Sequence, residues 1–380
     1  MHVAQISFFT DPEGRTPGQL LHDWPTLVDV AEAASGAGVR VSVVQACSHS
    51  QYLVSNGVSY HFLPFGRGAS TGGDSAGCLG KLLRKLAPEV LHVQGLGFPR
   101  DVLSLTALAP GIPILLQDHA SRPPPLWWRP LWRRGLSVAS GVAFCALRQA
   151  QPFAKVGLIH PRTMVYEIPE STSRFAPGDQ DEARRATGLR GNPLVLWVGH
   201  LDANKDPLTA LDGISKAAGT LPELQVCFCF GTAPLLRTVQ RRIAADPLLR
   251  DRVQLLGRVP HERVEQLMRA ADFFVLGSHR EGSGYSLIEA LACGLSPVVT
   301  DIPSFRSLTD AGTVGMLWPC GDARKLCAAL VSIALRPKRE IREAVRAHFD
   351  AELSFAALGR KLRATYEDLL QREPMYSGHP

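Results

Sequence analysis

Short apolar runs alternate along this chain with stretches of helical periodicity. The runs occupy residues 3–9, 39–46, 90–95, 112–119, 141–146, 193–199, 224–231, 252–259, 273–278 and 296–301. Each is apolar almost throughout, as expected of strands buried on both faces. Strands that alternate with helices form parallel sheets covered by helices. The pattern predicts an α/β protein with two doubly wound, Rossmann-like domains.

The boundary between the two domains lies where the composition changes. Residues 171–193 are rich in small, polar and turn-forming residues, and 380 residues are too many for one ordinary core. We expect an N-terminal domain of residues 1–172, a linker of 173–192 and a second domain of 193–354. Residues 355–380 should form a helix that docks on a domain surface, followed by a frayed tail.

Composition excludes several protein classes. The chain is 45% hydrophobic and 20% charged, which is ordinary for a soluble enzyme. The start lacks the basic region of a signal peptide, and no apolar stretch reaches the length of about 20 residues that spans a membrane. We therefore expect a cytoplasmic protein. The net charge of +6 favours anionic partners such as nucleotides or acidic lipids. No nucleic-acid-binding motif accompanies it, so no nucleic-acid partner is expected.

The segment HREGSGYSLIEALACG, residues 279–294, places Glu281 and Glu289 on either side of a glycine-containing turn. Glu281 directly follows an apolar run, and a helical pattern begins after Gly284. Glycines and a helix N-terminus can hold phosphate or sugar oxygens, and carboxylates accept hydrogen bonds from hydroxyl pairs. A nucleotide sugar has both features. Alternatively, Ser286 and Glu289 form a capping box, which leaves Glu281 without a role.

Two further residues follow apolar runs. Lys205, in WVGHLDANKDP, lies near the start of a predicted helix, where ammonium and helix dipole could hold a diphosphate. A solvated lysine is the alternative. His119 ends the run 112–119 and could donate to substrate oxygens or be a structural histidine.

Together, His119, GHLDANKD and REGSGYSLIEALACG resemble the retaining glycosyltransferases of family four, which have the two-domain GT-B fold with a central cleft. VYEIPESTSRFAP is similar to the family's linker entry, and the last helix to the one that returns toward the first domain. The resemblance implies an enzyme that needs neither metal nor cofactor. It would move a sugar from a nucleoside-diphosphate sugar to a hydroxyl of a glycan, a lipid-linked glycan or a small molecule.

The resemblance also implies residue roles. Glu289 would hold the donor's ribose hydroxyls, Glu281 would contact the transferred sugar, Lys205 would hold the diphosphate, and His119 would face the sugar from the first domain. The donor would be lined by the backbone of Gly282, Ser283, Gly284, Tyr285 and Ser286. The reaction would be a front-face displacement without an enzyme nucleophile.

Two features depart from the family's pattern. His200 stands where the family has an arginine that clamps the donor phosphates. The loop TDPEGRTPGQL replaces the family's Gly-Gly loop on the acceptor side, which leaves Gly14 as the matching glycine. The Asp-x-Asp of residues 179–181 falls in the linker, where a turn or helix cap is expected and not a metal site. No metal is predicted.

PPPLWWRPLWRRGL, residues 123–136, has two interpretations. It is either a helix that packs its tryptophans on the sheet or an interfacial helix on the inner face of a membrane. In the second case the acceptor would be lipid-linked. The contact would involve Trp127, Trp128, Trp132, Arg129, Arg133 and Arg134.

Two alternative functions stay open. A GT-B nucleotide-sugar epimerase would turn over the donor without an acceptor. A catalytically silent sugar-nucleotide-binding scaffold would bind the donor without turnover, and His200 together with the altered first loop favours it.

Overall fold

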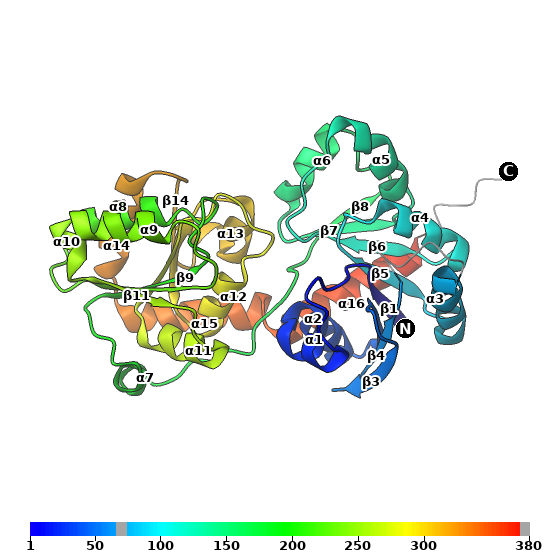
Figure 1. The fold of residues 1–380 in the computed structure, drawn as a ribbon, viewed down its shortest axis with the longest axis horizontal. Coiled ribbons are helices and arrows are strands. Elements are labelled where there is room, and N and C mark those ends of the chain that lie inside the picture. The colour runs from blue at the N-terminus through cyan, green and yellow to red at the C-terminus, as the bar shows by residue number, and fades with distance from the viewer. Residues whose placement is uncertain (66–73, 373–380) are drawn as a thin grey trace. The chain divides into compact units, whose positions relative to one another are not determined.

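The computed structural model describes residues 1–65 and 74–372. The chain divides into two compact α/β units (Figure 1). Unit 1 comprises Met1–Thr172 and the C-terminal segment from Phe355, whereas unit 2 is the continuous stretch Ser173–Ser354. Each unit has its own sheet with helices on both faces.

The sheet of unit 1 has eight strands in the order β3-β4-β2-β1-β5-β6-β7-β8. They are β1 (His2–Ser7), β2 (Arg40–Ala46), β3 (Gln51–Ser55), β4 (Val58–Leu63), β5 (Val90–Gln94), β6 (Ile114–Gln117), β7 (Gly141–Phe144) and β8 (Met164–Glu167). All neighbours are parallel except β3 and β4, which form a hairpin through Asn56 and Gly57. Both turn residues have positive φ, as a two-residue hairpin turn requires.

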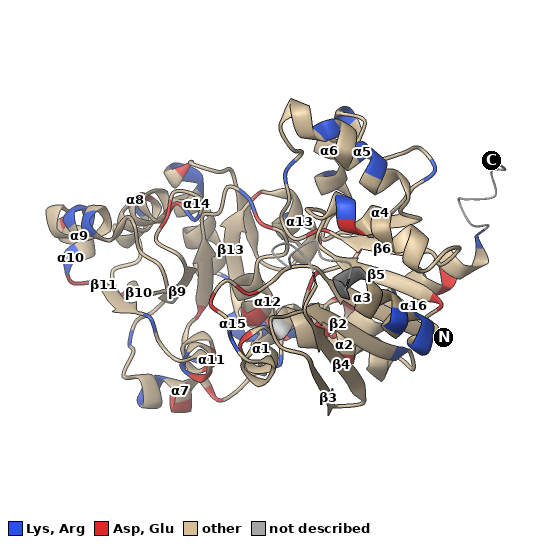
Figure 2. Cartoon of the chain, turned by 45° about the vertical axis from the view of Figure 1, so that its right-hand side comes forward, with Lys and Arg blue, Asp and Glu red and all other residues tan. Residues whose placement is uncertain are grey.

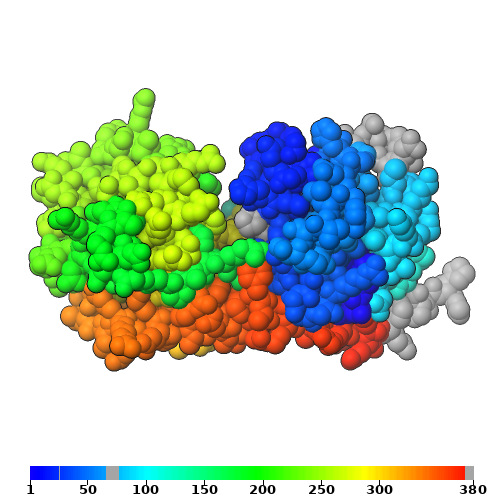
Figure 3. Space-filling view, turned by 90° about the horizontal axis from the view of Figure 1, so that it is seen from below, coloured from blue at the N-terminus to red at the C-terminus, as the bar shows by residue number. Residues whose placement is uncertain are grey.

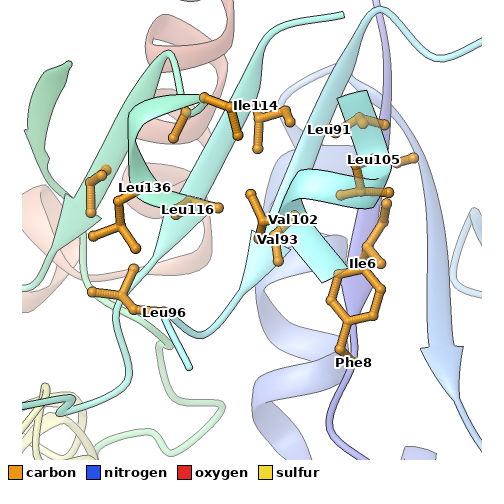
Figure 4. Packing of buried hydrophobic residues seen from close by; sticks show 14 of the residues in the cluster. Ile6, Phe8, Leu91, Val93, Leu96, Val102, Leu105, Ile114, Leu116 and Leu136 are labelled. Carbon is orange, nitrogen blue, oxygen red and sulfur yellow. The ribbon is translucent and has the colours of Figure 1, made fainter. Parts of the chain in front are cut away.

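Unit 1 also contains seven α-helices in its described part. They are α1 (Pro17–Asp23), α2 (Pro25–Gly36), α3 (Asp74–Leu86), α4 (Pro99–Leu108), α5 (Arg129–Ser137), α6 (Gln151–Lys155) and α16 (Phe355–Gln371). Short 3-10 helices cover Leu126–Trp128 and Leu147–Ala150. Strand β1 sends alternate side chains to two cores. Ile6 and Phe8 pack with residues of β5 and α4 (Figure 4), and Val3 packs on the opposite face.

The last helix completes the second of these cores. Leu358, Leu362 and Tyr366 of α16 are fully buried, and α16 packs on α2. In the space-filling view, red α16 lies against the blue N-terminal elements of its own unit (Figure 3). The Tyr366 hydroxyl is 2.8 Å from Nδ1 of His92 on β5. Burial lowers the pKa of His92 to about 3, so this imidazole is neutral at neutral pH.

The sheet of unit 2 has six parallel strands in the order β11-β10-β9-β12-β13-β14. They are β9 (Leu194–Gly199), β10 (Gln225–Phe230), β11 (Val253–Gly257), β12 (Phe273–Leu276), β13 (Ser296–Thr300) and β14 (Met316–Trp318). The helices are α7 (Gln180–Thr187), α8 (Pro207–Ala218), α9 (Leu236–Ala245), α10 (Pro247–Arg250), α11 (His261–Ala270), α12 (Tyr285–Ala292), α13 (Pro303–Leu308), α14 (Ala323–Ala334) and α15 (Lys338–Glu352), with a 3-10 helix at Asp310–Gly312.

In both sheets the strand order reverses once. In unit 2 the chain builds outward from β9 to β10 and β11 and then resumes on the other side at β12. In unit 1 the corresponding reversal separates β1 from β5. Loops on the two sides of such a point diverge at the carboxyl ends of the strands, which leaves a crevice for ligands.

The segment expected to be a linker is partly helical. Helix α7 begins after Asp179, whose Oδ1 accepts a hydrogen bond of 2.7 Å from the backbone N–H of Glu182. The interpretation of the Asp-x-Asp as a helix cap is confirmed. Arg184 of α7 then donates to buried Asp272 at 2.9 Å, which also accepts from the backbone N–H of Leu194. These contacts anchor α7 to the start of the β9 and β12 strands.

In the tryptophan-rich segment, one tryptophan packs on the core and two are exposed. Trp132 is partly buried against the apolar cluster of unit 1, as the interpretation of a helix packed on the sheet predicts. Trp127 is 77% exposed and Trp128 is 44% exposed. Arg133 donates to the carbonyl oxygen of Gly157 at 2.9 Å. Across residues 1–65 and 74–372, no helix combines the length and the apolar content needed to cross a membrane.

The packing of α16 on α2 gives a prediction for stability. A Cβ added at Gly359 would collide with the backbone carbonyl group of Ala33, so Gly359→Ala should destabilise the protein by about 1–3 kcal/mol. Chemical denaturation measures the change. Gly36→Ala is the matched control, because a Cβ at that position of α2 would meet no atom within 4 Å. Equal stability of the two variants would contradict the packing of α16 at Gly359.

Candidate functional site

Two loops of unit 2 meet at the strand-order reversal. Lys205, in the loop after β9, forms an ion pair with Glu281, in the loop after β12. The side chains are only 15% and 12% exposed, respectively. The backbone N–H of His279 donates to the carbonyl oxygen of Asn204 at 2.8 Å, and the Asn204 amide donates to the Arg280 carbonyl at 2.9 Å. The structure therefore brings together two residues that the sequence predicts separately.

The glycine-rich turn between Glu281 and α12 is buried and tightly packed. Gly282, Ser283 and Gly284 are buried, and Gly284 has φ of 84°. A Cβ at Gly284 would come within 2.6 Å of the Phe305 ring. Only glycine satisfies both the conformation and the space here. The turn places the positive end of the α12 dipole beside the Lys205–Glu281 pair.

Glu289 does not cap α12, so the capping-box interpretation is wrong. The N-cap residue is Gly284, and Ser286 lies inside the first turn of the helix. Oε1 of Glu289 is instead 2.6 Å from Nε2 of His261, at the start of α11. This carboxylate raises the pKa of His261 above its ordinary value of 6.5. The helix ends as predicted at Gly294, which has φ of 69°.

His200 lies at the same sheet edge, at the end of β9, and its side chain is exposed. Its Nδ1 accepts a hydrogen bond of 3.2 Å from the backbone N–H of Thr232, in the loop after β10. His279 contacts Asp206 at 3.0 Å, and Asp206 also caps α8. The carboxyl ends of two adjacent strands, β9 and β12, thus carry His200, Lys205 and Glu281.

In unit 1, His119 follows β6 and is held from two sides. Its Nδ1 lies 2.5 Å from Glu170, whose side chain is buried, and its Nε2 lies 2.8 Å from Oε1 of Gln94 at the end of β5. Burial raises the pKa of neighbouring Asp118. Gly14 has φ of 67° and lies in the loop after β1, where its N–H donates to Asp11.

Sequence reasoning missed the partners of the predicted residues: His261, Glu170, Gln94, Asn204, Asp206 and His279. His261 had a local signal, because it follows Pro260 where a helix begins after an apolar run. The other residues are polar positions at the ends of strands or in loops, and their pairing depends on which strands become neighbours.

Chemically, the edge of unit 2 combines an ammonium, two carboxylates, glycine backbone and a helix N-terminus. The ammonium and the helix dipole suit phosphate oxygens, and the carboxylates suit hydroxyl groups. Among residues 1–65 and 74–372, no three His, Cys, Asp or Glu side chains are grouped as metal ligands would be.

Comparison with known proteins places this arrangement in a family. Residues 179–347 match the model described as glycosyl transferases group 1. This part of the chain is therefore similar to the group 1 glycosyl transferases. The matched range covers most of unit 2, including Lys205, Glu281 and Glu289. The resemblance to family four, stated from the sequence, is confirmed.

Relatives and solved structures agree with the match. The chain is 28% identical over 233 residues to a GDP-mannose:cellobiosyl-diphosphopolyprenol alpha-mannosyltransferase of Xanthomonas campestris, covering 59% of each chain. It therefore spans less than two thirds of that relative's length. It is 34% identical over 167 residues to a D-inositol 3-phosphate glycosyltransferase of Mycolicibacterium vanbaalenii, covering 40% of this chain and 34% of that one.

The fold is shared over nearly the whole chain. The sucrose-phosphate synthase of Thermosynechococcus elongatus matches with a TM-score of 0.71 at 19% identity, over 97% of this chain and 99% of that chain. The predicted fold class is confirmed: the chain has the GT-B fold.

The His261–Glu289 pair predicts a pH-dependent contribution to stability. Because the pair raises the pKa of folded His261 above 6.5, its stabilisation is complete below that value. It is lost as the pH rises through the raised pKa. His261→Gln should therefore lower the melting temperature by about 1–3 °C near pH 5.5 and by less at alkaline pH, since the pair is partly exposed. Differential scanning fluorimetry across this range measures the difference.

His22→Gln is the control for this series, because His22 is exposed and distant in sequence from the pair. A destabilisation by His261→Gln that stays constant from acidic to alkaline pH would show that the ion pair is not its cause.

Proposed function

We propose that this chain is a retaining glycosyltransferase that moves a sugar from a nucleoside-diphosphate sugar to a hydroxyl acceptor without a metal ion. The observation that carries the proposal is the contact of Lys205 with Glu281 across the strand-order reversal of unit 2, beside the glycine-rich start of α12. A cation at that point suits the diphosphate of the donor, and a carboxylate beside it suits the hydroxyls of the donor's sugar.

Each residue has a proposed role toward the donor. Lys205 and the start of α12 hold the diphosphate and stabilise the negative charge that develops as the nucleotide leaves. Glu281 accepts hydrogen bonds from hydroxyls of the transferred sugar. When the donor binds, the Glu289 carboxylate gives up its hydrogen bond with His261 and accepts hydrogen bonds from the ribose hydroxyls instead. His200 extends the phosphate site, where an arginine would be stronger.

His119 is the proposed unit 1 contact for the reacting sugar. Glu170 and Gln94 fix its ring, so its orientation does not depend on bound substrate. Because the carboxylates Glu281 and Glu289 are committed to binding hydroxyls, no enzyme nucleophile is proposed. The acceptor oxygen bonds to the anomeric carbon on the face from which the diphosphate leaves. Its proton passes to the departing phosphate oxygen, and the bond from the anomeric carbon to that oxygen breaks.

Donor binding and transfer test the proposal together. Thermal shifts are measured with UDP, GDP, ADP, dTDP and their sugar conjugates, since a ligand of the native state raises the melting temperature. One nucleotide family should stabilise the protein. The Glu289→Ala variant should not be stabilised by that nucleotide. Lys205→Met should lower the affinity for the nucleoside diphosphate by at least about tenfold. Failure of every nucleotide to bind would overturn the proposal.

For the transfer step the informative substitution is Glu281→Gln. Glu281→Ala would leave Lys205 partly buried without its carboxylate, which is costly, whereas Gln keeps an acceptor oxygen. We expect Glu281→Gln to lose at least about a hundredfold in kcat while nucleotide binding is retained. Transfer should persist in EDTA. Donor turnover without an acceptor would indicate an epimerase, and binding without turnover across donors and acceptors would indicate a scaffold.

We further propose that the acceptor is lipid-linked and that residues 126–134 contact an anionic membrane surface. The mannosyltransferase relative is named for a diphosphopolyprenol acceptor. In this chain Leu126, Trp127 and Trp128 are exposed together, and Figure 2 shows basic positions on α5 and α6. Exposed aromatic residues beside arginines are typical of interfacial binding.

Vesicle co-sedimentation tests this surface. The protein should bind phosphatidylglycerol-containing vesicles more tightly than phosphatidylcholine vesicles, and Trp127→Ala should weaken binding about tenfold. Tyr52→Ala is the control, because Tyr52 is a similarly exposed aromatic residue on β3. Equal losses in the two variants, or no binding to anionic vesicles, would refute the membrane contact.

A further inference from the structure

The strand-order reversal in unit 1 has an aromatic rim. Phe8 and Phe9 end the first apolar run just beyond β1, beside the reversal. Phe8 is buried in the core, but Phe9 is 49% exposed. The Phe9 ring lies 5.6 Å from the ring of Trp24, which joins α1 to α2, with an angle of 43° between the ring planes. Two aromatic rings thus adjoin the crevice in which a ligand of unit 1 would bind.

The two rings are held in place by the loop between β1 and α1. The Phe9 carbonyl accepts a hydrogen bond of 2.6 Å from the Gln45 side chain, which fixes the backbone at the end of the strand. The Arg15 guanidinium lies over the Trp24 ring, 5.9 Å from its centre. The N–H of Arg15 donates to the Asp11 carboxylate at 2.7 Å. A ligand that stacks on these rings would not have to order them first.

The charges around the rings are predominantly acidic. Arg15 lies 3.8 Å from Asp11, 2.5 Å from Glu13 and 3.7 Å from Asp23. Three carboxylates around one guanidinium leave a net negative charge and several acceptor oxygens. Carboxylates bind hydroxyl groups and repel phosphates. The loop therefore suits a ligand that is uncharged, rich in hydroxyls and apolar on one face.

A pyranose ring has these properties, since its C–H groups form an apolar face that packs on aromatic rings while its hydroxyls project sideways. We propose that Phe9 and Trp24 form the binding platform for an uncharged saccharide unit of the acceptor, and that the acidic loop discriminates against acceptors phosphorylated at that unit. This inference rests on the proposed function and adds the chemical class of the group that receives the sugar.

Direct binding tests the platform without requiring turnover. Saturation-transfer NMR is carried out on the full chain with cellobiose, maltose and mannobiose as neutral probes and with myo-inositol 3-phosphate as an anionic one. At least one disaccharide should receive saturation from the protein. Phe9→Ala should weaken its binding about tenfold, and Phe9→Tyr should preserve it. Tyr52→Ala, which removes an exposed ring on β3, should have no effect.

A double variant tests whether the acidic side chains near the rings discriminate against phosphorylated ligands. Glu13 and Asp23 have side chains that are 68% and 44% exposed, so Glu13→Gln/Asp23→Asn should fold normally. We expect this double variant to gain affinity for myo-inositol 3-phosphate by at least about threefold while disaccharide binding changes little. Preferential binding of the phosphate by the unaltered protein, or no binding of any disaccharide, would overturn the inference. Phe9→Ala with unchanged disaccharide affinity would also overturn it.

Failure of this inference is distinguishable from failure of the proposed function. Phe9→Ala should show the same nucleotide-induced thermal shift as the unaltered protein, because Phe9 belongs to unit 1 and the nucleotide residues to unit 2. In transfer assays its effect should fall on the KM for the acceptor, by about tenfold, and not on the KM for the donor. Loss of nucleotide binding in the unaltered protein would instead refute the proposed function.

Discussion

The candidate site depends on the parallel pairing of β9 with β12. Phe273 and Phe274 of β12 pair with Val195 and Leu196 of β9, although nearly the whole first half of unit 2 separates them in sequence. Because parallel strands end at the same edge, this pairing brings the loop of Lys205 to the loop of Glu281. No local interaction could do so. The glycines of the second loop then allow α12 to start at that edge, with its dipole directed toward the ion pair.

Polar groups of this edge satisfy one another. Lys205 pairs with Glu281, and His261 pairs with Glu289. These pairs lower the cost of holding charged groups in a partly buried crevice. They also mean that a donor must exchange internal contacts for new ones, so binding energy depends on the difference between the two sets. A ligand that offers both a diphosphate and hydroxyls can replace both pairs, whereas phosphate alone can replace only one.

Each unit has a reversal of strand order, but the side chains around the two reversals differ in chemistry. The reversal in unit 2 is surrounded by an ammonium, carboxylates and glycine backbone. The one in unit 1 is bordered by the exposed ring of Phe9 and the partly buried ring of Trp24, and the next strand carries a histidine fixed by Glu170 and Gln94. Fold alone therefore does not determine what each edge binds. The side chains at the strand ends determine it.

The sequence predicts the buried framework well because burial on both faces leaves a continuous apolar run. The strands it misses lack such a run: β3 is mostly exposed, β4 alternates between buried and partly exposed residues, and β8 and β14 are only partly buried. Glu281, Lys205 and His119 are identifiable because each follows a run. Their partners Glu170 and His261 are not, because contact between them depends on the order of strands in the sheet. The capping box fails because Gly284 adopts the N-cap position and moves Ser286 into the helix.

The C-terminal helix has a consequence for biosynthesis. Unit 2 is continuous in sequence and is synthesised completely before α16 leaves the ribosome. Unit 1 is discontinuous, because unit 2 separates its first 172 residues from α16. Until the last residues emerge, the apolar surface that receives Leu358 and Leu362 and the buried imidazole of His92 have no cover. The first unit to be translated is therefore the last to be completed. During that interval its uncovered apolar surface favours aggregation, as it does in other incompletely folded chains.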